Sequence, residues 1–333
     1  MAGPPRSKPP RPPGAFTPMP SGSGAIPVFR VVFLVALSTA VIATLATVVT
    51  QTYGYGLFML LPLAAGFASA LLCNRGRKWD WSRTSMVLAL TLGLAGFLML
   101  GIEGIVCLLM ASVISSALAS IGAIIAWIVS KMKSHQRTML LLVCGIAPIT
   151  MGFEQRFKSA SPLLEQTTTI EVNAPPEVIW RFVPSFPRIE TAPDGLLAHG
   201  LAYPIEATMN GAGVGARRSC VLSTGHMPEI VTRWEPGRVL EFDVLETPPA
   251  MFESNPFFNA KPRHVEGYFT VKHGRFVLIP LEGGRTRIEG TSWFQHDLWP
   301  QAYWAPITSR VVKAVHERVL KHIKQLAENC AAE

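Results

Sequence analysis

Five long apolar runs between residues 28 and 151 limit what this chain can fold into more than any other feature. The first run, Val28–Thr50, is long enough to cross the hydrocarbon core of a bilayer, which takes about 20 helical residues. It is too long for the apolar part of a cleaved signal peptide, so we interpret it as a signal anchor. The other runs are Leu57–Cys73, Met86–Ile102, Ile105–Ser130 and Thr138–Met151. The sequence therefore predicts a membrane region of about five helices over residues 28–152.

Basic residues predict how these helices are oriented. Eleven of the 13 Lys and Arg residues in positions 1–160 fall on one side of a membrane that is crossed five times. They are Arg6, Lys8, Arg11, Arg30, Arg75, Arg77, Lys78, Arg83, Lys131, Lys133 and Arg137. Because cytoplasmic loops carry the excess of Lys and Arg, we expect a cytoplasmic N-terminus. Five spans then place the C-terminal part outside the cytoplasm, whereas four would keep it inside. The fifth run is short and contains Pro148. Whether it crosses the membrane decides the compartment of the C-terminal part.

Glu103 is the one acidic residue embedded in this apolar sequence, between the third and fourth runs. An ionisable side chain inside a membrane span is a functional candidate. The flanking glycines in "GIEG" also fit a tight turn at the membrane surface, where Glu103 would lie in headgroup water. The sequence leaves both interpretations open.

Charge and composition separate two parts of the chain and exclude some function classes. Residues 1–27 hold nine prolines and predict a disordered tail, because such a segment cannot bury a core. Residues 1–160 carry a net charge of +10 and residues 161–333 a net charge of −2, which together give the +8 of the whole chain. The soluble part thus lacks the basic surface that nucleic acid requires, and we expect no nucleic-acid partner. No CxxC pair occurs among the five cysteines, so we expect neither a metal site nor a redox cofactor.

Residues 161–333 predict a soluble α+β domain. Gln166–Val172 alternates like a strand, and Asn173 with the following prolines starts a short helix. Strand candidates follow at Gly200–Asn210, Ala216–Ser223, Glu229–Trp234, Arg238–Leu245, Tyr268–His273, Arg275–Pro280 and Thr286–Gln295. From about Ala305 an amphipathic helix begins, with an apolar stripe formed by Ile307, Val311, Val315, Val319, Ile323 and Leu326. A stripe of this kind lies on an apolar surface.

Three segments give this domain a resemblance to a known superfamily. They are "IEVNAPPEVIWRFV" near its start, "GVGARRSCVLSTG" in the middle and "GRTRIEGTSWFQHDLWPQAYW" before the last helix. Over about residues 166–329 the chain resembles the SRPBCC (START-like) superfamily, and within it the polyketide cyclase/dehydrase and lipid-transport family. The resemblance implies a helix-grip fold, in which a curved antiparallel sheet wraps around the long C-terminal helix and encloses a cavity for an apolar ligand. The attached multi-span region resembles that of bacterial members anchored in the inner (plasma) membrane.

Several residues are candidates for the ligand site. Glu289, Thr291 and Trp293 share one face of a predicted strand, and Tyr268 lies on a neighbouring strand. This face either lines the cavity or meets solvent, because strand alternation alone does not choose between the two. Of the neighbours Arg217 and Arg218 only one can point inward, and Arg217 is our candidate. Phe242 on the sheet and Val315 on the last helix complete the predicted lining.

Other motifs in the soluble part favour structural roles. "HERVL" at His316 resembles a zinc-binding helix, but Leu320 occupies the position of the second histidine ligand. We interpret His296 and Asp297 as the end of a loop rather than as a catalytic pair. The rings of "LWPQAYW" are expected to pack at the entrance to the last helix or to anchor it at the membrane.

Three function classes remain open from the sequence. The first is a membrane-anchored domain that binds or transfers a hydrophobic small molecule or lipid. The second is a cyclase or hydrolase that acts on such a molecule, with Glu289 or His264 as the acid or base. The third is a ligand-sensing or assembly module. The fold alone does not choose among them, because one fold hosts many functions.

Overall fold

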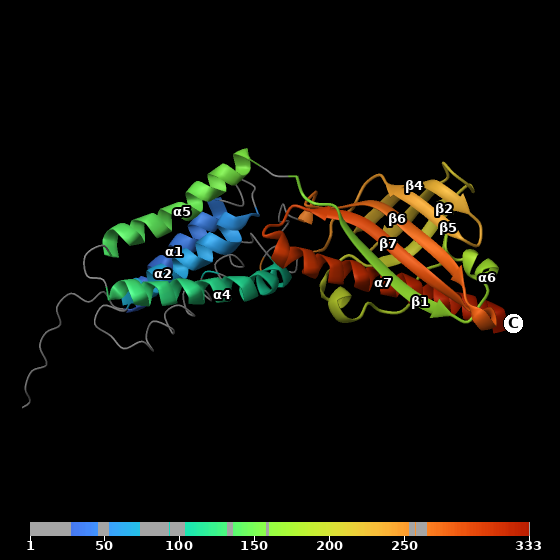
Figure 1. Cartoon of the computed structure of the whole chain (residues 1–333), viewed down its shortest axis with the longest axis horizontal. Coiled ribbons are helices and arrows are strands. Elements are labelled where there is room, and N and C mark those ends of the chain that lie inside the picture. Colours follow the sequence, from blue (N-terminus) through green and yellow to red (C-terminus); the bar gives the residue numbers. More distant parts are fainter. Residues whose placement is uncertain are drawn as a thin grey trace, which may run out of the picture.

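The computed structural model describes residues 28–45, 53–73, 93, 104–131, 136–157, 160–252, 257 and 265–332. Helices fill the first part of the chain, and a sheet with a long helix forms the last part (Figure 1). The proposed disordered tail 1–27, Glu103, His264 and nearly all of the third apolar run lie outside the described residues.

The described helices of the first part coincide with four of the predicted apolar runs. They are α1 (Val28–Leu45), the π-helical turn η2 (Gly56–Leu60) that continues into α2 (Leu61–Cys73), α4 (Ile105–Ser130) and α5 (Gln136–Arg156). In the described part of the chain, three helical segments are long and apolar enough to cross a membrane, and α1 is slightly shorter. The fifth predicted run is one of the three, because α5 continues through Pro148.

Glycines allow α2 and α4 to cross at close range. A Cβ atom on Gly66 would lie 2.0 Å from the main-chain oxygen of Ala119, and one on Gly122 would lie 2.1 Å from that of Leu63. Both distances are far below van der Waals contact, and both neighbours are backbone atoms. Small residues at crossing points are typical of helix pairs in membranes, where close packing replaces the hydrophobic effect as the driving force.

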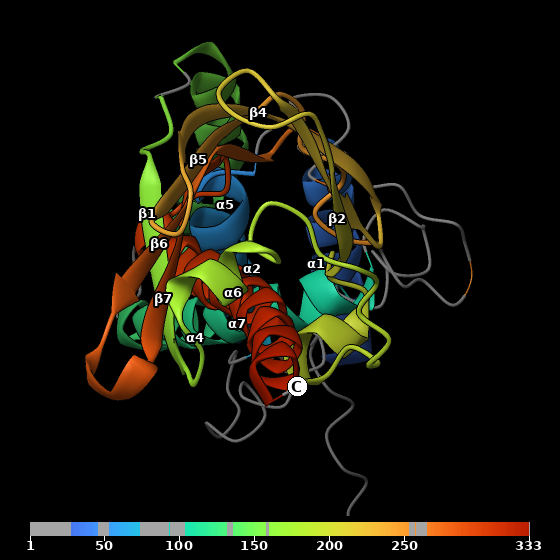
Figure 2. The ribbon, with the colours of Figure 1, turned by 90° about the vertical axis from the view of Figure 1, so that its right-hand side faces the viewer.

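Seven antiparallel strands form one sheet in the order β1-β7-β6-β5-β4-β3-β2. The strands are β1 (Leu164–Val172), β2 (Pro204–Asn210), β3 (Arg217–Leu222), β4 (Gly225–Glu235), β5 (Val239–Val244), β6 (Phe269–Pro280) and β7 (Thr286–His296). The single-turn helices α6 (Pro176–Trp180), η3 (Gly195–His199) and η5 (Glu282–Gly284) lie in the connections. The sheet curls as a half-barrel around α7 (Gln301–Ala332), which is the predicted helix-grip arrangement (Figure 2).

Strand β6 joins two strands that the sequence predicted as separate. The strand candidates Tyr268–His273 and Arg275–Pro280 were separated at Gly274, yet one strand continues through this residue with a register shift between Val271 and His273. A Cβ atom at Gly274 would lie 2.4 Å from the ring of Phe242 on the neighbouring strand. The glycine therefore makes room for an aromatic ring inside the sheet and does not end the strand.

The core of the domain lies between the sheet and the C-terminal half of α7. Leu320, Ile323 and Ala327 of α7 are fully buried there, together with Ile179 from α6 and Ile288 from β7. The N-terminal half of α7 packs elsewhere. It meets the ends of the N-terminal helices, where the side chain of Tyr303 donates a hydrogen bond to the main-chain oxygen of Met110 in α4.

Candidate functional site

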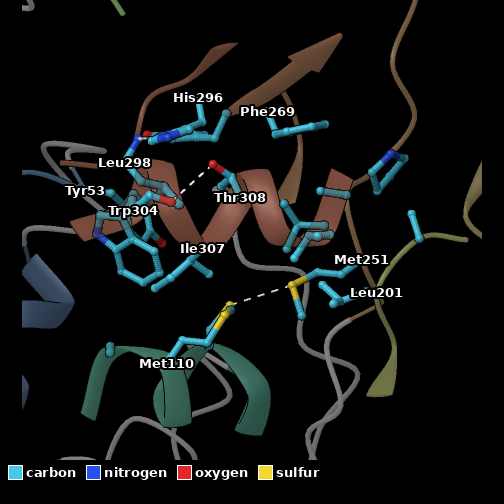
Figure 3. Close-up of a pocket in the computed structure, with 18 of the residues that line it drawn as sticks. Tyr53, Met110, Leu201, Met251, Phe269, His296, Leu298, Trp304, Ile307 and Thr308 are labelled. Atoms are coloured by element: carbon cyan, nitrogen blue, oxygen red, sulfur yellow. Dashed lines mark hydrogen bonds between the residues drawn. The ribbon is translucent and has the colours of Figure 1, made fainter. Parts of the chain in front are cut away.

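A cavity of about 300 Å³ lies where the helical part meets the domain. Helix α7 forms one wall and α4 the opposite wall, as Figure 3 shows for Trp304, Ile307 and Met110. Further lining comes from Ala43 on α1, Leu57, Phe58 and Leu61 of η2 and α2, and Leu201, Met251 and Tyr268 of the domain. The cavity extends inward along α7 as far as Val315, His316 and Val319. Its volume is at the lower end of the usual range for small-molecule sites.

The lining is apolar and uncharged. Among the described residues that line it there is no Asp, Glu, Lys or Arg. The few polar side chains come from Ser, Thr, Tyr, Trp and His, so the cavity favours a ligand that is mostly hydrocarbon. A charged group placed here would lose its hydration without gaining a partner of opposite charge.

His316 and Ser292 form one of the polar spots in the lining. The His316 Nε2 atom lies 2.8 Å from the Ser292 hydroxyl, and its Nδ1 atom lies 3.2 Å from the Thr168 hydroxyl. Burial lowers the pKa of His316 to about 4, so the imidazole is neutral at neutral pH. The alternation of β7 places Ser292 toward α7, where the helix presents His316.

His296 and Trp304 form a second polar spot, closer to the N-terminal helices. The Nδ1 atom of His296 accepts a hydrogen bond of 3.4 Å from the main-chain N–H of Leu298. The other ring nitrogen of His296 and the indole nitrogen of Trp304 are buried and have no hydrogen-bond partner among the described residues. Burial lowers the pKa of the His296 imidazole and outweighs the nearby Asp297 carboxylate, so His296 is also neutral.

A buried ion pair lies in the sheet core, apart from the residues that line the cavity. The guanidinium of Arg218 contacts the carboxylate of Glu229 and donates a 2.8 Å hydrogen bond to the main-chain oxygen of Pro184. It also lies over the ring of Phe242, 4.9 Å from the ring centroid. Burial is the largest single effect and acts to lower the pKa of Arg218, but Glu229 and Cys220 together raise the pKa above its ordinary value, so Arg218 remains charged. The pair therefore organises the core.

The structure places the predicted ligand residues in three environments. Tyr268 and Val315 line the cavity. Phe242 is buried in the core beside Arg218, and Arg217 is exposed, so the inward arginine of that pair is Arg218 and not the candidate Arg217. The acid–base candidate His264 lies outside the described residues.

Glu289, Thr291 and Trp293 occupy the opposite face of β7 from the cavity. Gly290 lies close to Leu320 of α7 and Ser292 bonds His316, so the even-numbered residues face the helix. Alternation then turns the odd-numbered residues outward. There the indole of Trp293 donates to Glu165 at 3.1 Å and lies against the Arg275 guanidinium. This corrects the expectation that this face converges on the ligand.

Sequence reasoning missed the histidines and Trp304 as lining residues. His316 was discounted as a metal ligand and His296 as part of a loop, yet both face the cavity. One signal was available for His316, because it follows Val315 on the predicted apolar stripe of the last helix. Nothing in the sequence indicated that residues of α1, α2 and α4 complete the lining. Among the described residues, no three His, Cys, Asp or Glu side chains are grouped to hold a metal ion.

Comparisons with known proteins concern the domain. Among the solved structures that match, three illustrate the similarity, and each match covers about half of this chain. A Chromobacterium violaceum protein is 14% identical, with 49% of this chain and 96% of that chain covered and a TM-score of 0.30. A Nitrosospira multiformis protein is 17% identical, with 49% and 94% covered and a TM-score of 0.31. Norcoclaurine synthase from Thalictrum flavum, in complex with a transition-state analogue, is 12% identical, with 52% and 98% covered and a TM-score of 0.33.

No curated protein matches this chain. A family match covers residues 164–328, which begin at β1 and end within α7, and the family is described as polyketide cyclase/dehydrase and lipid transport. All seven strands of the half-barrel lie within these residues, and so does α7 up to residue 328. Residues 164–328 are therefore a domain of the polyketide cyclase/dehydrase and lipid transport family.

Proposed function

We propose that this protein is a membrane-anchored binding protein that takes a hydrophobic small molecule or lipid into a cavity between its helices and its domain. The observation that carries the proposal is the uncharged cavity whose lining comes from α1, α2 and α4 on one side and from the domain on the other. A ligand in this cavity touches both parts of the chain. Such a site suits uptake from a bilayer or delivery to one, without passage through water.

The outer surfaces of the helices support anchoring in a membrane. Large apolar side chains are exposed along α1, α4 and α5, among them Phe29, Leu109, Val113, Leu141 and Ile149. Contiguous apolar surface of this extent is unfavourable in water and marks contact with lipid or with another protein. Together with the lengths of the helices, this favours lipid.

The helix ends next to the domain support the proposed orientation. Tyr53, just before α2, accepts a hydrogen bond from the main-chain N–H of Trp299, and the start of α4 meets Tyr303. The C-terminal end of α5 lies at the same level, because Glu154 accepts a hydrogen bond from the main-chain N–H of Gly56. Lys131 is at the opposite end of α4. We propose five spans, with the cation-rich loops and the N-terminus in the cytoplasm and the domain on the other side of the inner membrane.

A reporter that is active only after export tests this orientation. Fused after Glu333 of the full chain, it is expected to be active, and the same reporter fused after Lys131 is expected to be inactive. Activity only after Lys131 would reverse the topology. Equal behaviour of both fusions would mean that α5 does not cross.

Mass spectrometry of co-purified lipids tests the binding function. The full chain, purified in mild detergent, is expected to carry an apolar molecule in a fixed ratio. Val315→Trp fills the cavity at a lining position and should reduce the bound amount at least tenfold, while overpacking costs about 1–3 kcal/mol of stability. Arg310→Trp adds the same ring on an exposed part of α7 and serves as the matched control. Equal lipid content in the two variants would show that the lipid does not bind in this cavity.

Ser292 and His316 give the enzymatic alternative a specific site. A serine hydroxyl 2.8 Å from an imidazole nitrogen is the arrangement of an activated nucleophile and its base. The partner on the other ring nitrogen is the Thr168 hydroxyl, which carries no charge to stabilise an imidazolium. The pKa of about 4 also makes His316 a weak base at neutral pH, so we rank binding above catalysis.

Labelling with a fluorophosphonate probe separates the two functions. An esterase-type or acyl-transfer enzyme would be labelled at Ser292, and the label would disappear in Ser292→Ala but persist in Ser219→Ala. We expect no label on Ser292 in the wild-type protein, with lipid content unchanged in both variants. Labelling that depends on Ser292 would instead favour the enzyme.

A further inference from the structure

The cavity has one feature that a purely apolar ligand would leave unused. At the end of the cavity that borders the N-terminal helices, two buried hydrogen-bond donors, on His296 and Trp304, have no partner in the described part of the chain. Figure 3 shows both side chains at the end marked by Tyr53 and Leu298, away from Met251 and Leu201. The inference below rests on the proposed binding function and concerns the chemistry of the ligand.

His296 is a donor at its free nitrogen. Its side chain is 1% exposed, and its Nδ1 atom already accepts a hydrogen bond from the main-chain N–H of Leu298. A neutral imidazole carries one proton, so the proton belongs on Nε2. This Nε2–H group has no acceptor among the described residues.

Trp304 adds a second donor from α7. Its side chain is 4% exposed, and the indole N–H is a donor in every protonation state. The ring is held in place by Phe58 of the membrane region and by Tyr303, at centroid distances of 5.0 and 5.1 Å. The indole N–H nevertheless has no acceptor among the described residues. Buried donors normally have a partner, so two in one cavity end indicate that an acceptor belongs there.

The charge of that acceptor follows from the rest of the lining. Neither Lys nor Arg is among the described lining residues, and His296 is neutral, so a carboxylate or phosphate would be buried without a countercharge. An ammonium group fits even less, because both free groups are donors. An uncharged oxygen, such as a carbonyl, ester or ether oxygen, accepts hydrogen bonds without this cost.

We infer that the ligand is a neutral lipid with an oxygen acceptor at one end, bound by the N–H groups of His296 and Trp304, and with a hydrocarbon part along Val311 and Val315. Helices α2 and α4 border the donor end, so the oxygen of the ligand lies toward the membrane region and its hydrocarbon part points into the domain. In this orientation the two donors favour neutral lipids over fatty acids and phospholipids, which carry a charge.

Competition with three chains of matched length tests the inference. The full chain in nanodiscs is loaded with a fluorescent apolar probe, and heptadecane, 2-heptadecanone and heptadecanoate are titrated as competitors. We expect the ketone to compete about tenfold better than the alkane, the size of effect that hydrogen bonds to buried donors typically give. The carboxylate should compete no better than the alkane. Equal competition by ketone and alkane, as expected if water alone satisfies the donors, would overturn the inference and leave the binding function intact.

Two variants assign the preference to its residues. Trp304→Phe keeps a ring and removes the N–H, and it should reduce severalfold the ketone preference, measured as the ratio of ketone to alkane competition within the same variant. His296→Phe should act in the same direction, and retained probe binding reports that each variant is folded. Arg310→Trp changes an exposed position of α7 that is absent from the cavity lining, and it should keep the full preference. Preference for the carboxylate, or an unchanged ketone preference in both donor variants, would contradict the assignment. Failure of the folded wild type to bind any probe would overturn both the inference and the binding function.

Discussion

The two halves of α7 carry one continuous apolar stripe but have different partners. In the C-terminal half, Leu320, Ile323 and Ala327 are at most 1% exposed and pack against strands. In the N-terminal half, Trp304 and Ile307 meet loops of the domain and the ends of α2 and α4 instead. Strands of a curled sheet fit side chains closely around a helix, whereas helix ends and loops leave the cavity. An amphipathic pattern thus identifies a buried helix face without telling whether core or ligand covers it.

Among the predicted variants, the largest loss of unfolding free energy is expected at the buried ion pair in the sheet core. Arg218→Ala leaves the Glu229 carboxylate buried without its partner, so the variant should lose about 3–5 kcal/mol of unfolding free energy. Arg217→Ala, at the exposed neighbouring position, is the control and should change little. Denaturant titration of the full chain in detergent, followed through the sheet signal in circular dichroism, measures both. Similar losses in the two variants would place the pair outside the core.

The C-terminal half of α7, which packs against strands, should show the next largest loss of stability on substitution. Ile323→Ala removes a side chain that is 0% exposed and leaves a hole among strands, at a cost of about 2–5 kcal/mol. Ligand content should stay at the wild-type level, because Ile323 is absent from the cavity lining. The same denaturant titration, together with mass spectrometry of bound lipid, checks the two parts of this prediction. Loss of ligand without loss of stability would mean that the cavity extends further along α7 than the described lining.

His316 lies at the border between the two halves and should make stability depend on pH. Burial lowers its pKa in the folded state to about 4, below the ordinary value of 6.5. Below pH 6.5, His316 binds a proton in the unfolded chain but not in the folded chain. The free energy of unfolding therefore falls as the pH drops from about 6.5 to 4. The loss attributable to this group reaches about 3 kcal/mol. It should disappear in His316→Gln, compared by thermal unfolding at pH 7 and pH 4.5, and an unchanged pH slope in that variant would refute the assignment.

The N-terminal half of α7, which borders the cavity, should show the smallest loss of stability on substitution. Ile307→Ala enlarges a space that already exists, so we expect a loss of about 1 kcal/mol or less, well below that of Ile323→Ala. Affinity for the fluorescent apolar probe should fall measurably, because the ring or chain of the ligand loses a contact. A stability loss equal to that of Ile323→Ala would show that the two halves are packed alike.

The sequence predicted much of the fold, and the physical reasons are local. Apolar runs of membrane length, the alternation in the strands and the 3.6-residue stripe of α7 each depend on neighbours in the chain, and α5 forms despite Pro148. The division of β6 at Gly274 was wrong because of a partner on another strand, the ring of Phe242. Local patterns indicate elements, whereas contacts between distant elements decide where they continue or end.

The cavity shows what the sequence determined alone and what required the tertiary structure. From the sequence we predicted Tyr268 and Val315 as ligand residues, and both are part of the cavity lining. Tyr268 lies just before β6, and Val315 lies on the apolar stripe of α7. The sequence did not decide which face of β7 meets α7. Both faces carry aromatic or hydroxyl side chains, and alternation separates the two faces without telling which one is turned toward the helix. The contacts of Gly290 and Ser292 with α7 made that choice and turned Glu289 and Trp293 outward. The tertiary structure also joined residues more than 200 positions apart, such as Phe58 and Trp304, into one lining, because long-range packing places them there and no local pattern encodes it.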